Sequence, residues 1–187
     1  MSAPSCQRRR ADGGFGLLEL IITVAIIAIL AAIALPSFAT TLRTTRVRTE
    51  AHDLMSALNI ARNEAVTRSR NVTICAADTR IAVPTACGES GDWKHGWIVF
   101  LDQTASGAPG DVIAPTDILR SWNGNEKNSL ISAGDRTYVR FTARGAAQLD
   151  SVQVFTLKPQ DACLQQQERR IEVNPLGRFS STAVDCS

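Results

Sequence analysis

The chain has 187 residues, with 20 lysines and arginines, 18 aspartates and glutamates, and a formal net charge of +2. Three of the arginines and one aspartate lie in the first 14 residues, so the remaining 173 residues hold 17 basic and 17 acidic side chains and are neutral overall. The composition therefore excludes any argument for nucleic-acid binding from bulk charge, and the length suffices for one small domain with its own core.

The most informative stretch runs from Phe15 to Leu35 and is apolar apart from one carboxylate, Glu19. At about 1.5 Å of rise per residue, such a helix reaches roughly the thickness of a bilayer's hydrocarbon core. The run Arg8–Arg10 precedes it, which predicts that the N-terminus stays in the cytoplasm. The alternative is a secretory signal peptide cut near Ala32–Ala34, but the apolar run is longer than a usual signal core. A carboxylate within hydrocarbon also predicts a buried cationic partner.

The segment from Gly14 to Leu20 resembles the class III signal of type IV pilins and type II secretion pseudopilins. The resemblance implies cleavage between Gly14 and Phe15 by a prepilin peptidase and methylation of the new N-terminal amine of Phe15. Pro36 falls where pilins usually carry a helix-kinking proline. Glu19 matches the glutamate that pairs with the N-terminal amine of a neighbouring subunit during assembly. Gly16 departs from the threonine that is more usual in the family.

These observations divide the chain into three expected parts. Residues 1–14 form a leader peptide, residues 15–42 a hydrophobic membrane and assembly helix, and residues 43–187 a globular domain outside the cytoplasm. Removal of the leader takes one of five cysteines with it, and an even number in an exported domain suggests disulfides. Three pairings are possible, and proximity in the sequence favours Cys75 with Cys87 and Cys163 with Cys186. No metal site is expected, because the chain has no CxxC pair and only two histidines, His52 and His95.

The helix is expected to continue beyond Pro36 to about Arg70. Its second half carries one apolar stripe of helical period, which consists of Val47, Ala51, Leu54, Leu58, Ala61 and Ala65. The charged residues are expected on other faces; they are Arg43, Arg46, Arg48, Glu50, Asp53, Arg62, Glu64 and Arg68. The pattern favours a helix that lies on a sheet with a solvated outer face, while phosphate binding by its arginines is the alternative.

From Asn71 the hydrophobic period changes to two. Each expected strand is rich in β-branched or aromatic residues; the strands are Asn71–Ala76, Trp97–Leu101, Ile118–Trp122, Tyr138–Thr142, Val152–Leu157 and Arg170–Val173. One long helix followed by short strands indicates an α+β fold with an antiparallel sheet. No GxSxG, Walker, HExxH or dinucleotide-binding motif occurs, so neither an enzyme nor a cofactor is expected.

Several stretches of the globular part are similar to the GspH/FimT group of minor pilins and H-type pseudopilins. The stretches are Trp93–Phe100, Asp102, Ile118–Arg120, Phe141–Gly145, Arg170–Val173 and Gly177–Arg178. The resemblance implies a type IV pilin-like fold. For the tryptophans, the large apolar ring with one polar N–H favours core packing and loop anchoring over ligand binding.

Some members of this group bind duplex DNA during natural transformation through a Gly-Arg-x-Arg loop near the C-terminus. Here Gly177 and Arg178 match, but Ser180 stands in place of the second arginine. A phosphate-binding patch would need further cations, for which Arg169, Arg170 and Lys158 are candidates. The alternative is that Gly177 supplies a positive φ in a hairpin and that Arg178 pairs with an acidic neighbour.

The resemblance as a whole implies a minor type IV pilin of the FimU/FimT type, a subunit of the pilus tip that helps to start assembly. Its partners would be other pilins, the prepilin peptidase and the inner membrane. The alternatives are an H-type minor pseudopilin of type II secretion and a DNA-binding pilin for transformation.

Overall fold

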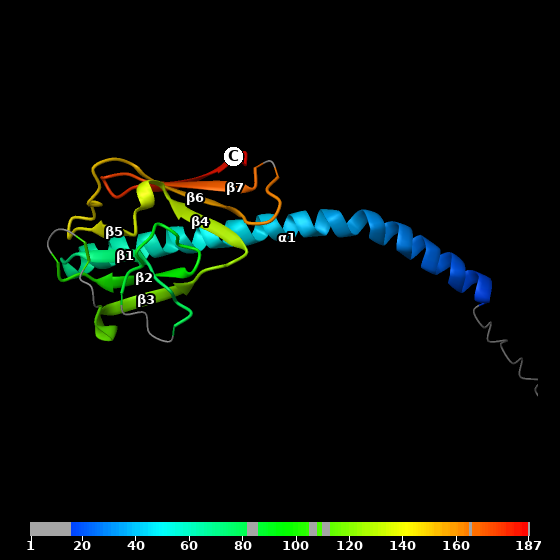
Figure 1. Ribbon diagram of the computed structural model, residues 1–187, viewed down its shortest axis with the longest axis horizontal. Helices are drawn as coiled ribbons and strands as arrows, with labels where there is room; N and C mark the ends of the chain where they lie inside the picture. Colours follow the sequence, from blue (N-terminus) through cyan, green and yellow to red (C-terminus); the bar gives the residue numbers. More distant parts are fainter. Residues whose placement is uncertain (1–15, 82–85, 105–107, 110–112, 165, 187) are drawn as a thin grey trace, which may run out of the picture. The chain divides into compact units, whose positions relative to one another are not determined.

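The computed structural model describes residues 16–81, 86–104, 108–109, 113–164 and 166–186. One helix, α1, runs from Leu17 to Arg68 and is followed by eight strands in this part of the chain (Figure 1). The chain divides into two compact units, residues 1–41 and residues 42–187. The predicted helix is therefore confirmed, and it ends within two residues of the expected position.

The strands form two antiparallel four-stranded sheets. The first sheet has the order β3-β2-β1-β5, where β1 is Val72–Ala76, β2 is Gly96–Leu101, β3 is Ile118–Asn123 and β5 is Tyr138–Phe141. The second sheet has the order β4-β6-β7-β8, where β4 is Asn128–Ser132, β6 is Gln153–Pro159, β7 is Glu168–Val173 and β8 is Phe179–Val184. Two short 3₁₀ turns, Pro115–Asp117 and Ala133–Asp135, precede β3 and β5.

The α+β fold is as predicted, with two differences in the strands. The sequence patterns indicate six strands, and the structure adds β4 and β8, which lie at the two edges of the second sheet. The strands consequently form two sheets, each of which contributes one face to the core.

The core of the second unit lies between α1 and both sheets. Each residue of the predicted apolar stripe of α1, from Val47 to Ala65, is buried, as is Ala57. The sheets contribute Ile74, Trp97 and Phe141 from one side and Phe155 and Ile171 from the other. An amphipathic helix that buries one stripe against two sheets explains why the hydrophobic period changes from helical to alternating near residue 70.

The tryptophans serve packing. Trp93 is fully buried and makes an edge-to-face contact with Phe155, with ring centroids 5.0 Å apart. Its indole Nε1 donates a hydrogen bond to the carbonyl oxygen of Arg136 at 3.1 Å. Trp93 thus fastens the loop before β2 to the second sheet, and Trp97 is buried in the same core.

Two disulfides close loops of the second unit. Cys75 on β1 is joined to Cys87, and Cys163 before β7 is joined to Cys186 after β8. These are the pairs that proximity in the sequence favours. The first ties the loop after β1 back to its strand, and the second holds the last residues of the chain against the segment that enters β7.

One charged helix residue lies where the sequence pattern did not place it. Glu50 is buried, whereas the helical period assigned it to a solvated face. Asn128, also buried, donates a hydrogen bond from Nδ2 to Glu50 Oε2 at 2.5 Å. The edge strand β4, absent from the prediction, therefore covers this face of the helix.

Candidate assembly interface

The N-terminal part of α1 has no core of its own. Between Leu17 and Ile33 its large apolar side chains are half or more exposed, including Leu17, Ile27 and Leu30 at 62 to 77%. This helix is long and apolar enough to cross a membrane, by length and composition. Exposed apolar surface is unfavourable in water by about 25 cal/mol per Å², so lipid or other helices are needed to cover it.

Glu19 lies in the first turn of α1, where the partial positive charge of the helix N-terminus favours a carboxylate. Its side chain is exposed, and no ion pair to it exists in the part of the chain that the structure describes. The expected processing residues, Gly14 and Phe15, lie outside the described residues.

The helix continues through position 36 without a break in its backbone assignment. The side chain of Pro36 lies outside the described residues, so its expected effect on the helix stays a prediction.

The turn between β7 and β8 is the site of the predicted Gly-Arg loop. Gly177 has φ of +74°, and a Cβ there would lie 2.0 Å from the carbonyl oxygen of Gly145, so only glycine fits. Arg62 on α1 donates a hydrogen bond from Nε to that same carbonyl at 3.1 Å. The turn is therefore held against a second loop and the helix. The predicted hairpin glycine is confirmed.

Arg178 is exposed at the end of this turn, and its backbone N–H donates to Asn174 Oδ1 at 3.0 Å. Its guanidinium makes no ion pair within the described residues, so the expected pairing with an acidic neighbour is not found there. Arg178 lines a shallow cleft with Glu172, which places one carboxylate beside the one exposed arginine of the motif.

The other candidate cations do not gather around Arg178. In the register of the second sheet, Arg169 pairs with buried Leu157 and Arg170 with Thr156. Because successive side chains of a strand point to opposite faces, Arg169 faces the core side and Arg170 the outer side. Lys158 shares the outer side with Arg170, whose Nε lies 3.2 Å from a carboxylate oxygen of Glu172. The structure thus divides the four candidates between two faces and leaves Arg170 paired.

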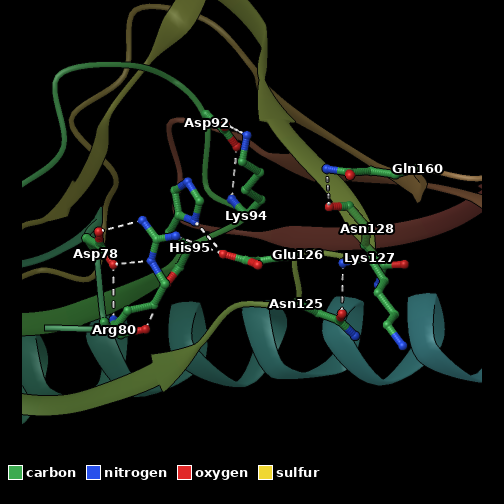
Figure 2. A network of polar contacts seen from close by, with 11 residues as sticks. Asp78, Arg80, Asp92, Lys94, His95, Asn125, Glu126, Lys127, Asn128 and Gln160 are labelled. Carbon is green, nitrogen blue, oxygen red and sulfur yellow. Dashed lines mark hydrogen bonds and ion pairs between the residues drawn. The ribbon is translucent and has the colours of Figure 1, made fainter.

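A second polar cluster joins three loops at one end of the first sheet (Figure 2). Arg80 contacts Asp78 at 2.7 Å and Glu126 at 2.8 Å, and His95 Nδ1 lies 3.6 Å from the same Glu126 carboxylate. The hydrogen bond from Arg80 lowers the pKa of Asp78 to about 2. Arg80 and Glu126 are largely exposed, so their ion pair fixes loop geometry more than it stabilises the fold.

The first sheet also holds a buried ion pair that sequence patterns missed. Arg140 and Asp102 are both nearly fully buried, and Arg140 Nε lies 2.7 Å from Asp102 Oδ2. Thr73 donates a hydrogen bond to the same oxygen at 2.6 Å. Burial by itself raises the pKa of Asp102, but the hydrogen bonds from Thr104, Thr73 and Arg140 outweigh it and lower that pKa. The sequence feature that could have indicated this pair is the position of Arg140 between Val139 and Phe141 in a predicted strand.

The second unit thus has a hydrophobic core of its own, whereas the apolar side chains in the N-terminal part of α1 remain exposed. The family model described as type II transport protein GspH matches residues 50–177. The chain belongs to the GspH family. A prokaryotic N-terminal methylation motif matches residues 9–35, which cover the predicted cleavage point and the whole apolar stretch from Phe15 to Leu35.

Solved structures show the same fold. Two crystal structures of the type IV minor pilin FimU of Pseudomonas aeruginosa PAO1 are 20% identical to this GspH-family chain. One covers 72% of this chain and 91% of its own, with a TM-score of 0.51, and the other covers 74% and 89%, with a TM-score of 0.53. Among the curated proteins, no sequence matches this one.

Family membership confirms the pilin or pseudopilin interpretation. The methylation motif and the apolar helix indicate a membrane-anchored precursor that prepilin peptidase processes and that assembles with other pilins or pseudopilins. Such proteins are structural rather than enzymatic in type.

Proposed function

We propose that this chain is a minor type IV pilin that joins the pilus tip and promotes the start of assembly. Residues 1–14 are removed as a leader, Phe15 becomes the methylated N-terminus, and residues 15–42 anchor the precursor in the inner membrane. Residues 43–187 then lie in the periplasm and, after assembly, in the pilus. The observation that carries the proposal is the uncovered apolar half of α1 in a chain with both a methylation motif and a GspH domain.

In the proposed mechanism, the apolar half of α1 leaves the lipid and packs among the helices of other subunits. Glu19 is the single carboxylate of this stretch and has no ion-pair partner in the described part of the chain. Pairing with the N-terminal amine of a neighbour offsets the cost of a charge in apolar surroundings and aligns the two helices. Pro36 supplies a local break in the backbone hydrogen bonds that lets the helix bend during packing.

The test is the substitution Glu19→Ala in the full chain, with Ile27→Ala as a matched control on the same exposed helix. We expect Glu19→Ala to be cleaved and to fold normally, yet to be absent from sheared surface filaments, while Ile27→Ala enters them. Mass spectrometry of the mature chain reports cleavage after Gly14 and methylation of Phe15. Incorporation of Glu19→Ala at the level of the unsubstituted protein would contradict the proposed role of this residue.

The second candidate is an H-type minor pseudopilin of type II secretion, which the description of the matching family model favours. Deletion of the gene separates the two. Loss of surface pili with normal protein secretion supports the pilin, whereas loss of secretion with normal pili supports the pseudopilin.

A further inference from the structure

Cationic side chains gather at one cleft beside α1, and its two helix residues, Arg48 and His52, lie shortly after the apolar segment in the sequence. A surface cleft of about 190 Å³ is lined by Arg48 and His52 of α1, Arg169 of β7 and Ser181 of β8, with Ala51 and Met55 at its apolar side. Three of these side chains carry or can carry positive charge, and none is a carboxylate. All residues that line the cleft belong to the second unit, and none of them takes part in the loop network around Arg80 and Glu126.

The position of Arg169 is unusual for a cation. It pairs with Leu157 in the sheet register and projects on the helix-facing side, the side to which Phe155 and Ile171 contribute core residues. There it lines one cleft with Arg48 of α1, and no carboxylate is among the residues that line this cleft. In the part of the chain that the structure describes, neither Arg48 nor Arg169 makes an ion pair. Two like charges on facing elements repel each other, and a bound anion would offset that repulsion.

The lining fits a phosphate group. Arginine binds phosphate oxygens through two parallel N–H donors, and here two arginines from different elements line one cleft. The Ser181 hydroxyl adds a neutral donor. Two arginines and a hydroxyl supply more donors than one carboxylate can accept, so this combination suits a phosphate ester better than a carboxylate-bearing peptide.

The place of the cleft along the chain indicates the source of the phosphate. Arg48 follows Leu42 by six residues, about 9 Å of helix, and Arg43 and Arg46 lie between them. Helical side chains tilt toward the helix N-terminus, so these arginines lean toward the apolar segment. Arginines next to a membrane helix attract acidic lipid headgroups.

We propose that the cleft lined by Arg48, His52, Arg169 and Ser181 binds the phosphate headgroup of an acidic phospholipid while the precursor is in the membrane. The proposal rests on membrane anchoring within the proposed function but not on tip location or on the role of Glu19. It gives the subunit a second contact with the membrane, one that must be released when the helix is extracted.

The experiment uses the full chain in micelles with equal amounts of phosphatidylglycerol and phosphatidylcholine, and native mass spectrometry counts the lipids retained. We expect the unsubstituted protein to prefer phosphatidylglycerol and the double variant Arg48→Gln/Arg169→Gln to lose about thirtyfold of that preference. Arg120→Gln/Arg144→Gln removes the same charge from exposed sites on other elements and should keep the preference. Arg48→Lys/Arg169→Lys should keep part of it, which separates lost charge from lost folding.

Three outcomes would overturn the proposal. One is equal retention of both lipids by the unsubstituted protein, and another is an unchanged preference in Arg48→Gln/Arg169→Gln. The third comes from parallel titrations: tight binding of inorganic phosphate or of duplex DNA to this cleft, without any lipid preference, would assign it to a free or nucleic-acid phosphate. Because the assay does not require filaments, its failure would leave the Glu19 experiment, and hence the proposed assembly role, unaffected.

Discussion

The two halves of α1 use apolar residues in opposite ways. From Leu17 to Ile33 the large apolar side chains are exposed around the helix, whereas from Val47 to Ala65 one apolar stripe is completely buried by two sheets. The first half has the composition of a helix for lipid or for a bundle of helices, and the second has the period of a helix on a sheet. One continuous helix can therefore serve two surroundings, since only the second half is satisfied within its own chain.

This difference predicts that truncation of a large apolar side chain destabilises the protein in the buried core but not on the exposed half of α1. Phe155→Ala removes a fully buried ring that contacts Trp93 and should lower the free energy of unfolding of residues 42–187 by about 3 to 5 kcal/mol. Ile27→Ala, on the exposed half, should leave that free energy unchanged within about 0.5 kcal/mol. Urea unfolding of the full chain in detergent, followed by tryptophan fluorescence, measures both. Equal losses would mean that the exposed half of α1 contributes to the stability of the core as much as a buried ring of β6 does.

Both disulfides lie in the second unit, residues 42–187, which has its own core and is expected to be stable without a partner. Replacement of Cys75 and Cys87 by alanine opens a loop with a sequence separation of 12 and should destabilise the domain by roughly 3 kcal/mol. The Cys163 and Cys186 pair, with a separation of 23, should cost a similar amount. Thermal melts under oxidising and reducing conditions test this. A reduced unsubstituted protein that melts at the oxidised temperature would contradict it.

Periodicity predicted the elements with strong hydrophobic patterns and missed the two edge strands of the second sheet, β4 and β8. The stripe from Val47 to Ala65 and strands such as Trp97–Leu101 have strong hydrophobic patterns, and both were predicted. Strands β4 and β8 have the sequences NSLIS and FSSTAV, in which serine, asparagine and threonine predominate. Such edge strands are held by pairing with one neighbour, and their polar residues resemble a loop.

The candidate site shows the same limit. The exposed helix and Glu19 follow from composition, and the methylation motif covers the same region. Cations adjacent in sequence do not form a patch, since Arg169 and Arg170 point to opposite faces of β7. Conversely, Arg48 and Arg169 are 121 residues apart and line one cleft. Tertiary packing decides both arrangements. The hydrophobic period of a single sequence indicates which face of an element is buried, but not which elements pack against each other.

Glu50 provides a pH-dependent test of the half of α1 that is buried by the sheets. Burial raises its pKa above the ordinary value of 4.5, although the hydrogen bond from Asn128 opposes this, and nearby Asp53 raises it further. The folded state therefore holds a proton on Glu50 that the unfolded state releases between its ordinary pKa and the raised one. Stability should fall as pH rises through that window.

Glu50→Gln keeps an acceptor for Asn128 and removes the titration. The variant should be more stable than the unsubstituted protein at pH 7, by roughly 1.4 kcal/mol for each unit by which the folded pKa exceeds 4.5. The difference should vanish below pH 4.5. Unfolding curves at pH 4 and pH 7 measure it. A variant that is less stable at pH 7 would contradict this prediction. It would show that the ionised Glu50 carboxylate stabilises the folded state through contacts with neighbouring groups.

The smallest expected effect concerns DNA and the outer face of the second sheet. Arg178 is the one exposed arginine of the motif, a carboxylate lines its cleft, and Arg170 is paired with Glu172. Duplex affinity depends on several phosphates neutralised together, so one cation contributes little. We expect no salt-sensitive binding of residues 43–187 to duplex DNA in a gel-shift titration, and no change for Arg178→Ala. Binding that weakens with salt and with Arg178→Ala would instead mean that this face assembles a phosphate-binding patch from side chains that lie apart in the free subunit. In that case the globular domain would bind DNA, and the exposed half of α1 would serve only in assembly.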